Sequence, residues 1–226
     1  VRLVSSDGST GTGFFFGFKV HGQTVPVIIT NKHVVNDNEN EEVSFYLHSL
    51  DEKYNLPGEE KINIDFVTKW YFHPNQDLAF CLAAPLFKRI EGLRKKIFYQ
   101  LIDGDYIWDN YQLEELSAIE DVIMVGYPNG LWDEQNNFPL FRKGITSSHP
   151  AIDFNRKGVG VVDMACFPGS SGSPIFILNE NGYIDKHGNP HFHDKRIIFL
   201  GILFEGPQFT AEGEILMTSI SPKGKV

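Results

Sequence analysis

The chain has 226 residues, 42% of them hydrophobic and 13% aromatic, which is enough to bury one large β domain or two smaller lobes. Its formal net charge is −9, and the one basic stretch, residues 88–96, is interrupted by Glu91 and by apolar residues. Nucleic acids and anionic membranes are bound through clustered Lys and Arg, so this pattern argues against both as partners. No window approaches about 18 consecutive apolar residues, so no transmembrane helix is expected.

Short apolar runs, separated by glycine, proline and polar turn residues, predict an all-β chain of the kind that forms barrels or sandwiches. The phenylalanines at 14, 15, 16 and 18 are interpreted as packing inside a barrel. The expected strands, in chain order, are residues 13–20, 24–31, 43–48, 61–68, 78–83, 122–126, 141–146, 159–166, 174–178, 196–204 and 215–220.

In one segment the spacing of the apolar residues is that of a helix and not of a strand. Between Leu86 and Leu101 the apolar residues recur at spacings of three and four, which predicts an amphipathic helix. This helix and the polar segment 103–121 divide the expected strands into two groups. We therefore expect two antiparallel, six-stranded β-barrels joined by a short helical connection, one barrel in residues 1–105 and the other in residues 106–226.

The chain has two cysteines, Cys81 and Cys166, each within an apolar run that looks like a strand. This placement predicts free, buried thiols rather than a disulfide framework, and with it an intracellular, cytoplasmic protein. The first residue is Val1 rather than Met, so we expect that residues before it have been removed, and a targeting segment could be among them.

Three polar residues occur where nucleophilic catalysis by a serine would need them. Such catalysis requires a base within hydrogen-bond distance, a carboxylate that orients the base, and backbone N–H groups for the oxyanion. His33 follows the β-branched run "VIIT", and Asp77 follows a Pro-Asn turn and precedes an apolar strand. Ser171 lies in the turn "FPGSSGSPIF", residues 167–176. The order His33, Asp77, Ser171 is that of the chymotrypsin lineage.

Five motifs extend this pattern over nearly the whole chain, which resembles the trypsin-like serine peptidases and is closest to their bacterial HtrA/Deg-type branch. The motifs are "GTGFFF" at 11–16, "TNKHVV" at 30–35, "QDLAF" at 76–80, "VGYPNG" at 125–130 with "RKGITS" at 142–147, and "VDMACFPGSSGSP" at 162–174.

The resemblance implies a serine endopeptidase that cleaves protein or peptide substrates through an acyl-enzyme intermediate, without a metal or an organic cofactor. Ser171 would be the nucleophile, His33 the general base and then acid, and Asp77 the residue that fixes the histidine tautomer. The oxyanion hole would consist of the backbone N–H groups of Gly169 and Ser171. A glycine suits position 169 because such a turn needs backbone angles that a Cβ would resist.

The resemblance also suggests a primary specificity pocket. Ala165 stands where relatives specific for Arg or Lys have an aspartate, which implies an uncharged pocket. The substrate-binding strand would be "GILFEG", which ends with Phe204, Glu205 and Gly206. Glu205 could still attract a basic substrate residue from the rim. Ser170 replaces the aspartate that pairs with a freshly cut N-terminus in secreted relatives, so a zymogen switch of that kind is not expected.

Other interpretations remain open. His191 and His193 would share a face if they lay in a strand and could then hold zinc, although "HGNPHFHD" is rich in turn formers and favours a hydrated hairpin tip. A catalytically silent relative that binds peptides would have the same motifs. An α/β-hydrolase-type esterase, using Ser171 with Asp185 or Asp194 and a later histidine, would need alternating strands and helices after residue 121. The PDZ module common in HtrA relatives would lie outside this sequence.

Overall fold

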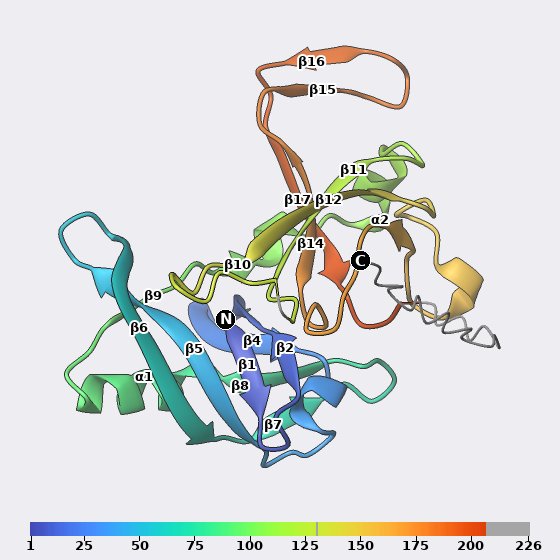
Figure 1. Ribbon diagram of the computed structural model, residues 1–226. Helices are drawn as coiled ribbons and strands as arrows, with labels where there is room; N and C mark the ends of the chain where they lie inside the picture. The colour runs from blue at the N-terminus through green and yellow to red at the C-terminus, as the bar shows by residue number, and fades with distance from the viewer. Residues whose placement is uncertain (130, 207–226) are drawn as a thin grey trace, which may run out of the picture.

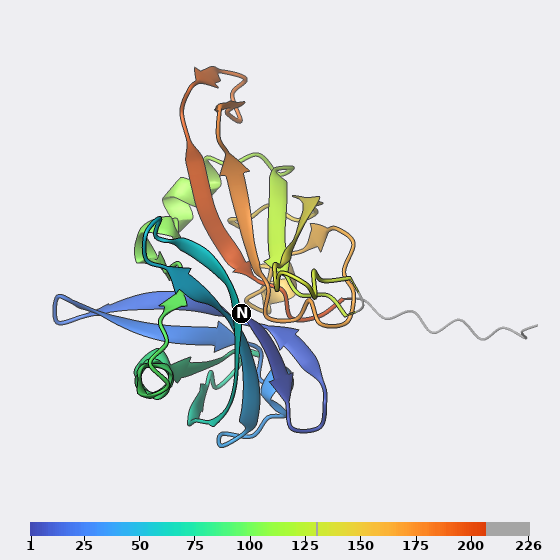
Figure 2. The same cartoon turned by 60° about the vertical axis from the view of Figure 1, so that its left-hand side comes forward.

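The structure is a computed structural model that describes residues 1–129 and 131–206. The chain forms two lobes that are rich in β-strands and lie side by side (Figures 1 and 2). The first contains the blue to green strands, and the second contains the yellow-green to red strands. The predicted all-β class with two lobes is confirmed.

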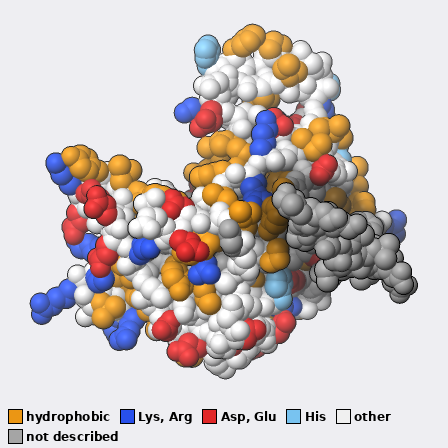
Figure 3. Space-filling model, viewed as in Figure 1, with side chains coloured by type: hydrophobic (Ala, Val, Ile, Leu, Met, Phe, Trp, Pro, Cys, Tyr) orange, Lys and Arg blue, Asp and Glu red, His pale blue; other side chains and the backbone are white. Residues whose placement is uncertain are grey.

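Acidic and basic side chains are interspersed over the first lobe on the face shown in Figure 3, and neither sign gathers into one large patch there. Within the described ranges, none of the helices has the length and apolar character needed to cross a lipid bilayer.

The first lobe contains two five-stranded sheets, antiparallel except for one parallel pair, β10 and β3. One sheet has the order β2 (Thr10–Thr12), β1 (Arg2–Ser5), β5 (Glu42–Asp51), β6 (Leu56–Val67), with β9 (Ile97–Phe98) also paired to β5. The other has the order β10 (Ile102–Asp103), β3 (Phe14–Val20), β4 (Gln23–Thr30), β8 (Ala79–Leu82), β7 (Trp70–Phe72).

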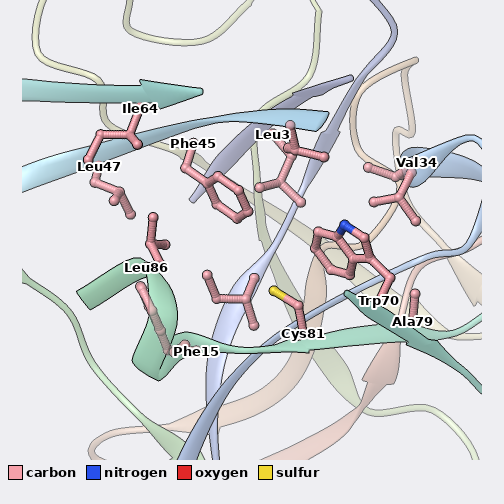
Figure 4. Packing of buried hydrophobic residues seen from close by; sticks show 14 of the residues in the cluster. Leu3, Phe15, Val34, Phe45, Leu47, Ile64, Trp70, Ala79, Cys81 and Leu86 are labelled. Carbon is pink, nitrogen blue, oxygen red and sulfur yellow. The ribbon is translucent and has the colours of Figure 1, made fainter. Parts of the chain in front are cut away.

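The core of the first lobe lies between these sheets and is closed on one side by helix α1 (Ala83–Gly92) (Figure 4). Leu3 and Phe45 enter it from one sheet, Cys81 and Trp70 from the other, and Leu86 from the helix. In the first half of β5, every second side chain is fully buried, the pattern of a strand with one face against a core. Removal of these apolar side chains from water is the main favourable contribution to the stability of the lobe.

The expected helix from Leu86 to Leu101 is only partly correct. Helix α1 ends at Gly92, and the chain then passes through Arg94, which has φ 56°, into strand β9. A residue in the left-handed region cannot continue an α-helix. Ile97 and Leu101 nevertheless pack against the same core as Leu86. The apolar spacing was therefore a correct sign of burial, but it did not show where the helix ends.

The connection between the lobes contains the short helices η2 (Gly104–Tyr106) and α2 (Asn110–Glu114). Helix α2 begins with a capping box, in which Asp109 accepts a hydrogen bond from the Gln112 amide and the Gln112 side chain accepts one from the Asp109 amide. The predicted division between residues 105 and 106 falls within η2, and these domain limits stay a prediction.

The second lobe contains a five-stranded antiparallel sheet with its own apolar core. Its order is β13 (Val162–Asp163), β12 (Leu140–Thr146), β11 (Asp121–Gly126), β14 (Pro174–Asn179), β17 (Arg196–Ile202). In the described part of the chain, strand pairing does not close either lobe into a complete barrel. The expected strand 215–220 and the chain end from 221 lie outside the described residues.

The segment after residue 121 bears on the esterase interpretation. In its described residues, 122–129 and 131–206, the only helix is the one-turn η3 (Phe154–Arg156). The described part of this lobe therefore lacks the alternation of strands and helices that an α/β-hydrolase fold requires.

The expected strand 159–166 forms only at Val162–Asp163, and this changes the position of one cysteine. Beyond Asp163 the backbone leaves the edge of the sheet, and Cys166 is exposed, contrary to the prediction. Cys81 is buried in β8, as predicted, and its burial raises the pKa of its thiol to about 12. Both cysteines are free.

Strands β15 (Gly182–Ile184) and β16 (Pro190–Phe192) form a hairpin that projects as an arm from β14 and β17 (Figure 1). The turn between them contains residues 185–189, so the predicted hairpin tip is present. Strand β16 ends at Phe192, and His193 has a left-handed backbone with φ 64°. His191 and His193 therefore do not alternate within one strand, which was the condition for the zinc interpretation.

The run of phenylalanines at 14, 15 and 16 has two buried faces. Phe15 packs in the core of the first lobe, as expected for barrel packing. Phe14 and Phe16 point the other way and pack between the lobes, where the ring centroids of Phe14 and Phe199 are 5.5 Å apart. Strand β3 therefore helps to hold the two lobes together.

Candidate active site

His33 and Asp77 meet at one edge of the first lobe. Strands β4 and β8 are antiparallel neighbours, and Thr30, the last residue of β4, pairs with Ala79, the first residue of β8. His33 comes three residues after Thr30, in the one-turn helix η1 (His33–Val35), whose two valines are buried in the core. Asp77 comes two residues before Ala79. The pairing of two buried strands therefore sets the distance between these polar side chains.

The His33 Nδ1 atom lies 2.5 Å from Asp77 Oδ2. The other oxygen of the carboxylate, Oδ1, accepts hydrogen bonds from the backbone amides of Lys32, at 2.7 Å, and His33, at 3.3 Å. Asn31, which is buried, donates from Nδ2 to the Asp77 carbonyl at 2.6 Å. Residues 31–33 thus hold Asp77 both at its carboxylate and at its backbone carbonyl.

This arrangement determines which nitrogen of His33 is basic. A carboxylate can only accept, so the neutral imidazole places its proton on Nδ1 and leaves the lone pair on Nε2. The His33 side chain is 45% exposed, whereas that of Asp77 is 27% exposed. Nε2 is therefore the atom available to take a proton from another group.

Ser171 lies in the second of two consecutive tight turns that precede β14. In the first, the Ser170 amide donates to the Phe167 carbonyl at 3.0 Å, and in the second, the Ser173 amide donates to the Ser170 carbonyl at 3.0 Å. Gly169 and Gly172 have φ of +86° and +83°. Both positions therefore require glycine, which agrees with the unusual backbone expected at Gly169.

The surroundings of these glycines leave no room for a side chain. A Cβ on Gly169 would lie 2.7 Å from the Tyr127 carbonyl oxygen, and one on Gly172 would lie 1.9 Å from the Thr12 carbonyl oxygen. The second of these contacts is with the first lobe. The turn is therefore pressed against β2 as well as against the lobe to which it belongs.

The two amides predicted for an oxyanion hole make no hydrogen bond within residues 1–129 and 131–206. The carbonyl of Pro168 accepts from the Asn129 amide at 2.7 Å, and in a trans peptide the Gly169 N–H points in the opposite direction. Among the described residues, neither the Gly169 amide nor the Ser171 amide donates to a protein acceptor. Both N–H groups are therefore without a protein partner in this part of the chain.

The Ser171 turn lies against the end of β4. The Thr12 amide donates to the Ser171 carbonyl at 2.8 Å, and Thr30 Oγ1 donates to the Thr12 carbonyl at 2.8 Å. Thr30 is the last residue of β4 before the turn that contains His33. Within the described ranges, however, the Ser171 hydroxyl makes no hydrogen bond, to His33 or to any other residue. The structure thus joins His33 to Asp77 and holds Ser171 through Thr12.

The residues predicted for the specificity pocket occupy two segments beside the turn. Ala165 is exposed, and its carbonyl accepts a hydrogen bond from Arg142 at 2.8 Å. The guanidinium of Arg142 also lies 4.3 Å from the centroid of the Phe167 ring. Arg142 was not singled out in the sequence, because its contact depends on the pairing of β12 with the segment before Ser171.

The second segment follows β17. The Gly172 amide donates to the Leu203 carbonyl at 2.8 Å, and the Leu203 amide donates to the Ser173 carbonyl at 2.9 Å. The regular strand ends at Ile202, earlier than predicted, and Phe204 is half-buried, whereas Glu205 and Gly206 are exposed. Residues from 207 onward lie outside the described part of the chain.

Thr12 was missed in the sequence, although it lies in the motif "GTGFFF". Its hydroxyl donates to the Gly169 carbonyl at 3.1 Å and accepts from the Tyr127 amide at 2.9 Å. The threonine between two glycines was the available signal, but its partners are 115 and 157 residues away in the chain.

Comparison with known proteins agrees with this arrangement. The family model described as the trypsin-like peptidase domain matches residues 11–184. No match was found among curated proteins. One solved structure that the chain resembles is the scabies mite inactivated protease paralogue S-I1, with 12% identity, 83% of this chain and 89% of that chain covered, and a TM-score of 0.38. At that TM-score the likeness says nothing about activity.

The family match confirms the predicted trypsin-like resemblance and a chymotrypsin-like fold, while the HtrA/Deg-type branch stays a prediction. The matched residues include His33, Asp77, Gly169 and Ser171. Because the family model extends over most of the sequence, this chain belongs to the trypsin-like peptidase domain family.

Proposed function

We propose that this protein is a serine endopeptidase in which Ser171, His33 and Asp77 form the catalytic triad. The observation that supports it most directly is the 2.5 Å contact between His33 Nδ1 and Asp77 Oδ2. The same carboxylate accepts hydrogen bonds from two backbone amides of the histidine turn. These bonds fix the carboxylate, and the carboxylate in turn keeps the imidazole in one orientation. A triad requires this tautomer and this orientation.

In the proposed reaction, Ser171 Oγ attacks the carbonyl carbon of a peptide bond while His33 Nε2 takes the hydroxyl proton. The carbonyl oxygen becomes an oxyanion and accepts hydrogen bonds from the backbone amides of Gly169 and Ser171. The C–N bond then breaks, and His33 gives its proton to the departing amine. Water, deprotonated by His33, attacks the resulting ester, which releases the acid and returns the proton to Ser171.

The substrate proposal is a peptide or protein with an uncharged residue at the primary pocket, since Ala165 has no charge to offer there. Glu205, which is exposed, is the alternative attraction for a basic residue. Neither a metal nor an organic cofactor has a step in this reaction. A peptide library whose cleavage is mapped by mass spectrometry tests activity and substrate preference together. Cleavage only after Arg or Lys would show that Glu205, and not Ala165, determines the primary specificity.

A finer assignment also remains a proposal. The motif pattern supports a place near the bacterial HtrA/Deg-type branch, and the two free cysteines support an intracellular location.

The test of the activity is labelling with a fluorophosphonate, which reacts covalently with an activated serine. We expect one label per chain on wild-type protein and none on Ser171→Ala. Ser9→Ala is the matched control, because Ser9 is a surface serine in the turn before β2, and this variant should be labelled like the wild type. Labelling that persists in Ser171→Ala would show that another residue is the nucleophile.

A second candidate function is a catalytically silent domain that binds peptides in the same region. The observation that favours it is the absence, among the described residues, of a hydrogen bond from the Ser171 hydroxyl to His33. Catalytic hydrogen bonds are often long in enzymes without substrate, so this observation does not decide between the two. Wild-type protein that is folded, binds peptides and takes no label would favour the silent domain.

A further inference from the structure

Thr12 contacts the Ser171 turn through both its backbone and its side chain. The residue lies in β2 of the first lobe and is 2% exposed. Its amide donates to the Ser171 carbonyl at 2.8 Å, and its hydroxyl donates to the Gly169 carbonyl at 3.1 Å. The hydroxyl also accepts from the Tyr127 amide at 2.9 Å. Two carbonyls of one turn are therefore held by a single residue of the other lobe.

These contacts affect the orientation of the peptide planes in the turn. In a planar trans peptide, fixing the carbonyl also fixes the N–H of the next residue. The carbonyls of Pro168 and Ser170, bonded to the Asn129 and Ser173 amides, orient the N–H groups of Gly169 and Ser171. Between these two peptides lies the Gly169–Ser170 peptide, and its carbonyl accepts a hydrogen bond from Thr12 Oγ1.

The same residue connects the turn to the histidine segment. The Thr12 carbonyl accepts from Thr30 Oγ1 at 2.8 Å, and Thr30 is the last residue of β4 before η1. Thr12 thus lies between the segment that contains His33 and the segment that contains Ser171. Loss of its hydroxyl would leave the Gly169 carbonyl and the Tyr127 amide, both buried, without their partner.

We propose that Thr12 is a positioning residue, whose hydroxyl holds the Gly169–Ser170 peptide in the orientation that directs the Gly169 and Ser171 amides toward the reacting carbonyl oxygen. This proposal rests on the proposed peptidase function. Thr12 does not contact the substrate in it. Its effect is on the transition state, because an oxyanion forms only there.

Thr146 is a matched control for this hydroxyl. It is 3% exposed, and its hydroxyl makes the same two kinds of hydrogen bond. Thr146 Oγ1 accepts from the Glu120 amide at 2.8 Å and donates to the Ala118 carbonyl at 2.7 Å. Glu120 and Ala118 precede β11, Thr146 is the last residue of β12, and none of the three belongs to a predicted site. Thr12→Val and Thr146→Val therefore each remove one buried hydroxyl with two hydrogen bonds, the first beside the Ser171 turn and the second away from it.

The experiment measures kcat and KM on a cleaved peptide, and the fluorophosphonate labelling rate, for both valine variants and for Thr12→Ser. We expect Thr12→Val to lower kcat and the labelling rate about tenfold with KM little changed. Thr12→Ser keeps the hydroxyl and should stay within about twofold of the wild type. Thr146→Val should lower the melting temperature but not kcat. Equal kcat for Thr12→Val and the wild type, or an equal loss in Thr146→Val, would overturn the proposal.

Hydrogen exchange gives a second measure that does not depend on activity. In Thr12→Val, the amides of Ser170, Gly172 and Ser173 should exchange faster than in the wild type, whereas in Thr146→Val they should not. If the wild type takes no label, the peptidase proposal fails, and unchanged exchange in Thr12→Val would separately show that Thr12 does not hold the turn. Thr12→Ala replaces Thr12→Val in both measurements if the valine variant does not fold.

Discussion

His33 and Asp77 are 44 residues apart in the chain, and their Nδ1 and Oδ2 atoms are 2.5 Å apart in the fold. The pairing of β4 with β8 produces this contact, since it brings the end of one strand and the start of the other to the same edge of a sheet. The pair is therefore held by the apolar core of the first lobe rather than by its own attraction.

Replacing Asp77 by Asn should reduce the labelling rate of Ser171 about ten-thousand-fold, because an amide that donates to Nδ1 favours the tautomer with its proton on Nε2. Asp65→Asn is the control, since Asp65 also accepts a hydrogen bond, from the Ser44 hydroxyl, but lies exposed in β6. The rates are read from the increase in labelled protein with time. A labelling rate for Asp77→Asn within about tenfold of the wild type would contradict the role proposed for Asp77.

Replacing Gly172 by Ala should destabilise the protein by about 3 kcal/mol or more, because its φ is +83° and the new Cβ would meet the Thr12 carbonyl oxygen. Gly8 has φ +85° and nothing within 4 Å of an added Cβ, so Gly8→Ala should cost only about 1 kcal/mol. Urea unfolding gives both free energies. Equal losses would mean that the contact with Thr12 adds nothing.

The ion pair between Arg196 and Glu120 is buried in the second lobe, with 2.5 Å between Nη2 and Oε2. Arg196→Met should lower the free energy of unfolding by about 3–5 kcal/mol, since it leaves a buried carboxylate without its partner. Lys143→Met removes one member of an exposed pair with Asp121 and should cost less than about 1 kcal/mol. Similar losses for the two variants would show that burial does not distinguish these pairs.

The two thiols should differ in reactivity in the folded protein. Cys81 is buried and its pKa is raised to about 12, so it should remain unmodified by iodoacetamide at about pH 8. Cys166 is exposed and should react, more slowly than a free cysteine because partial burial raises its pKa, and faster as the pH rises. Mass spectrometry of the digested protein assigns the label. Modification of Cys81 at the rate of Cys166 would show that β8 opens readily.

The all-β class and the two lobes could be predicted from the sequence, because they depend on local apolar patterns and turn residues that each short segment contains. His33 and Asp77 could be found for the same reason, as each follows or precedes a strand that its own neighbours define. The end of helix α1 could not, because Ile97 and Leu101 are apolar whether they face the core from a helix or from the extended segment around β9.

The contacts of Thr12 with Gly169 and Ser171, the packing of Phe14 against Phe199 and the exposure of Cys166 were decided only by the tertiary structure. Each depends on which surfaces of the two lobes meet, or on where a strand leaves its sheet. Strand patterns record whether a side chain is buried, but not which distant residue buries it. A hydroxyl at position 12 therefore has no visible partner in the sequence, although in the fold it bonds to the turn that contains the serine.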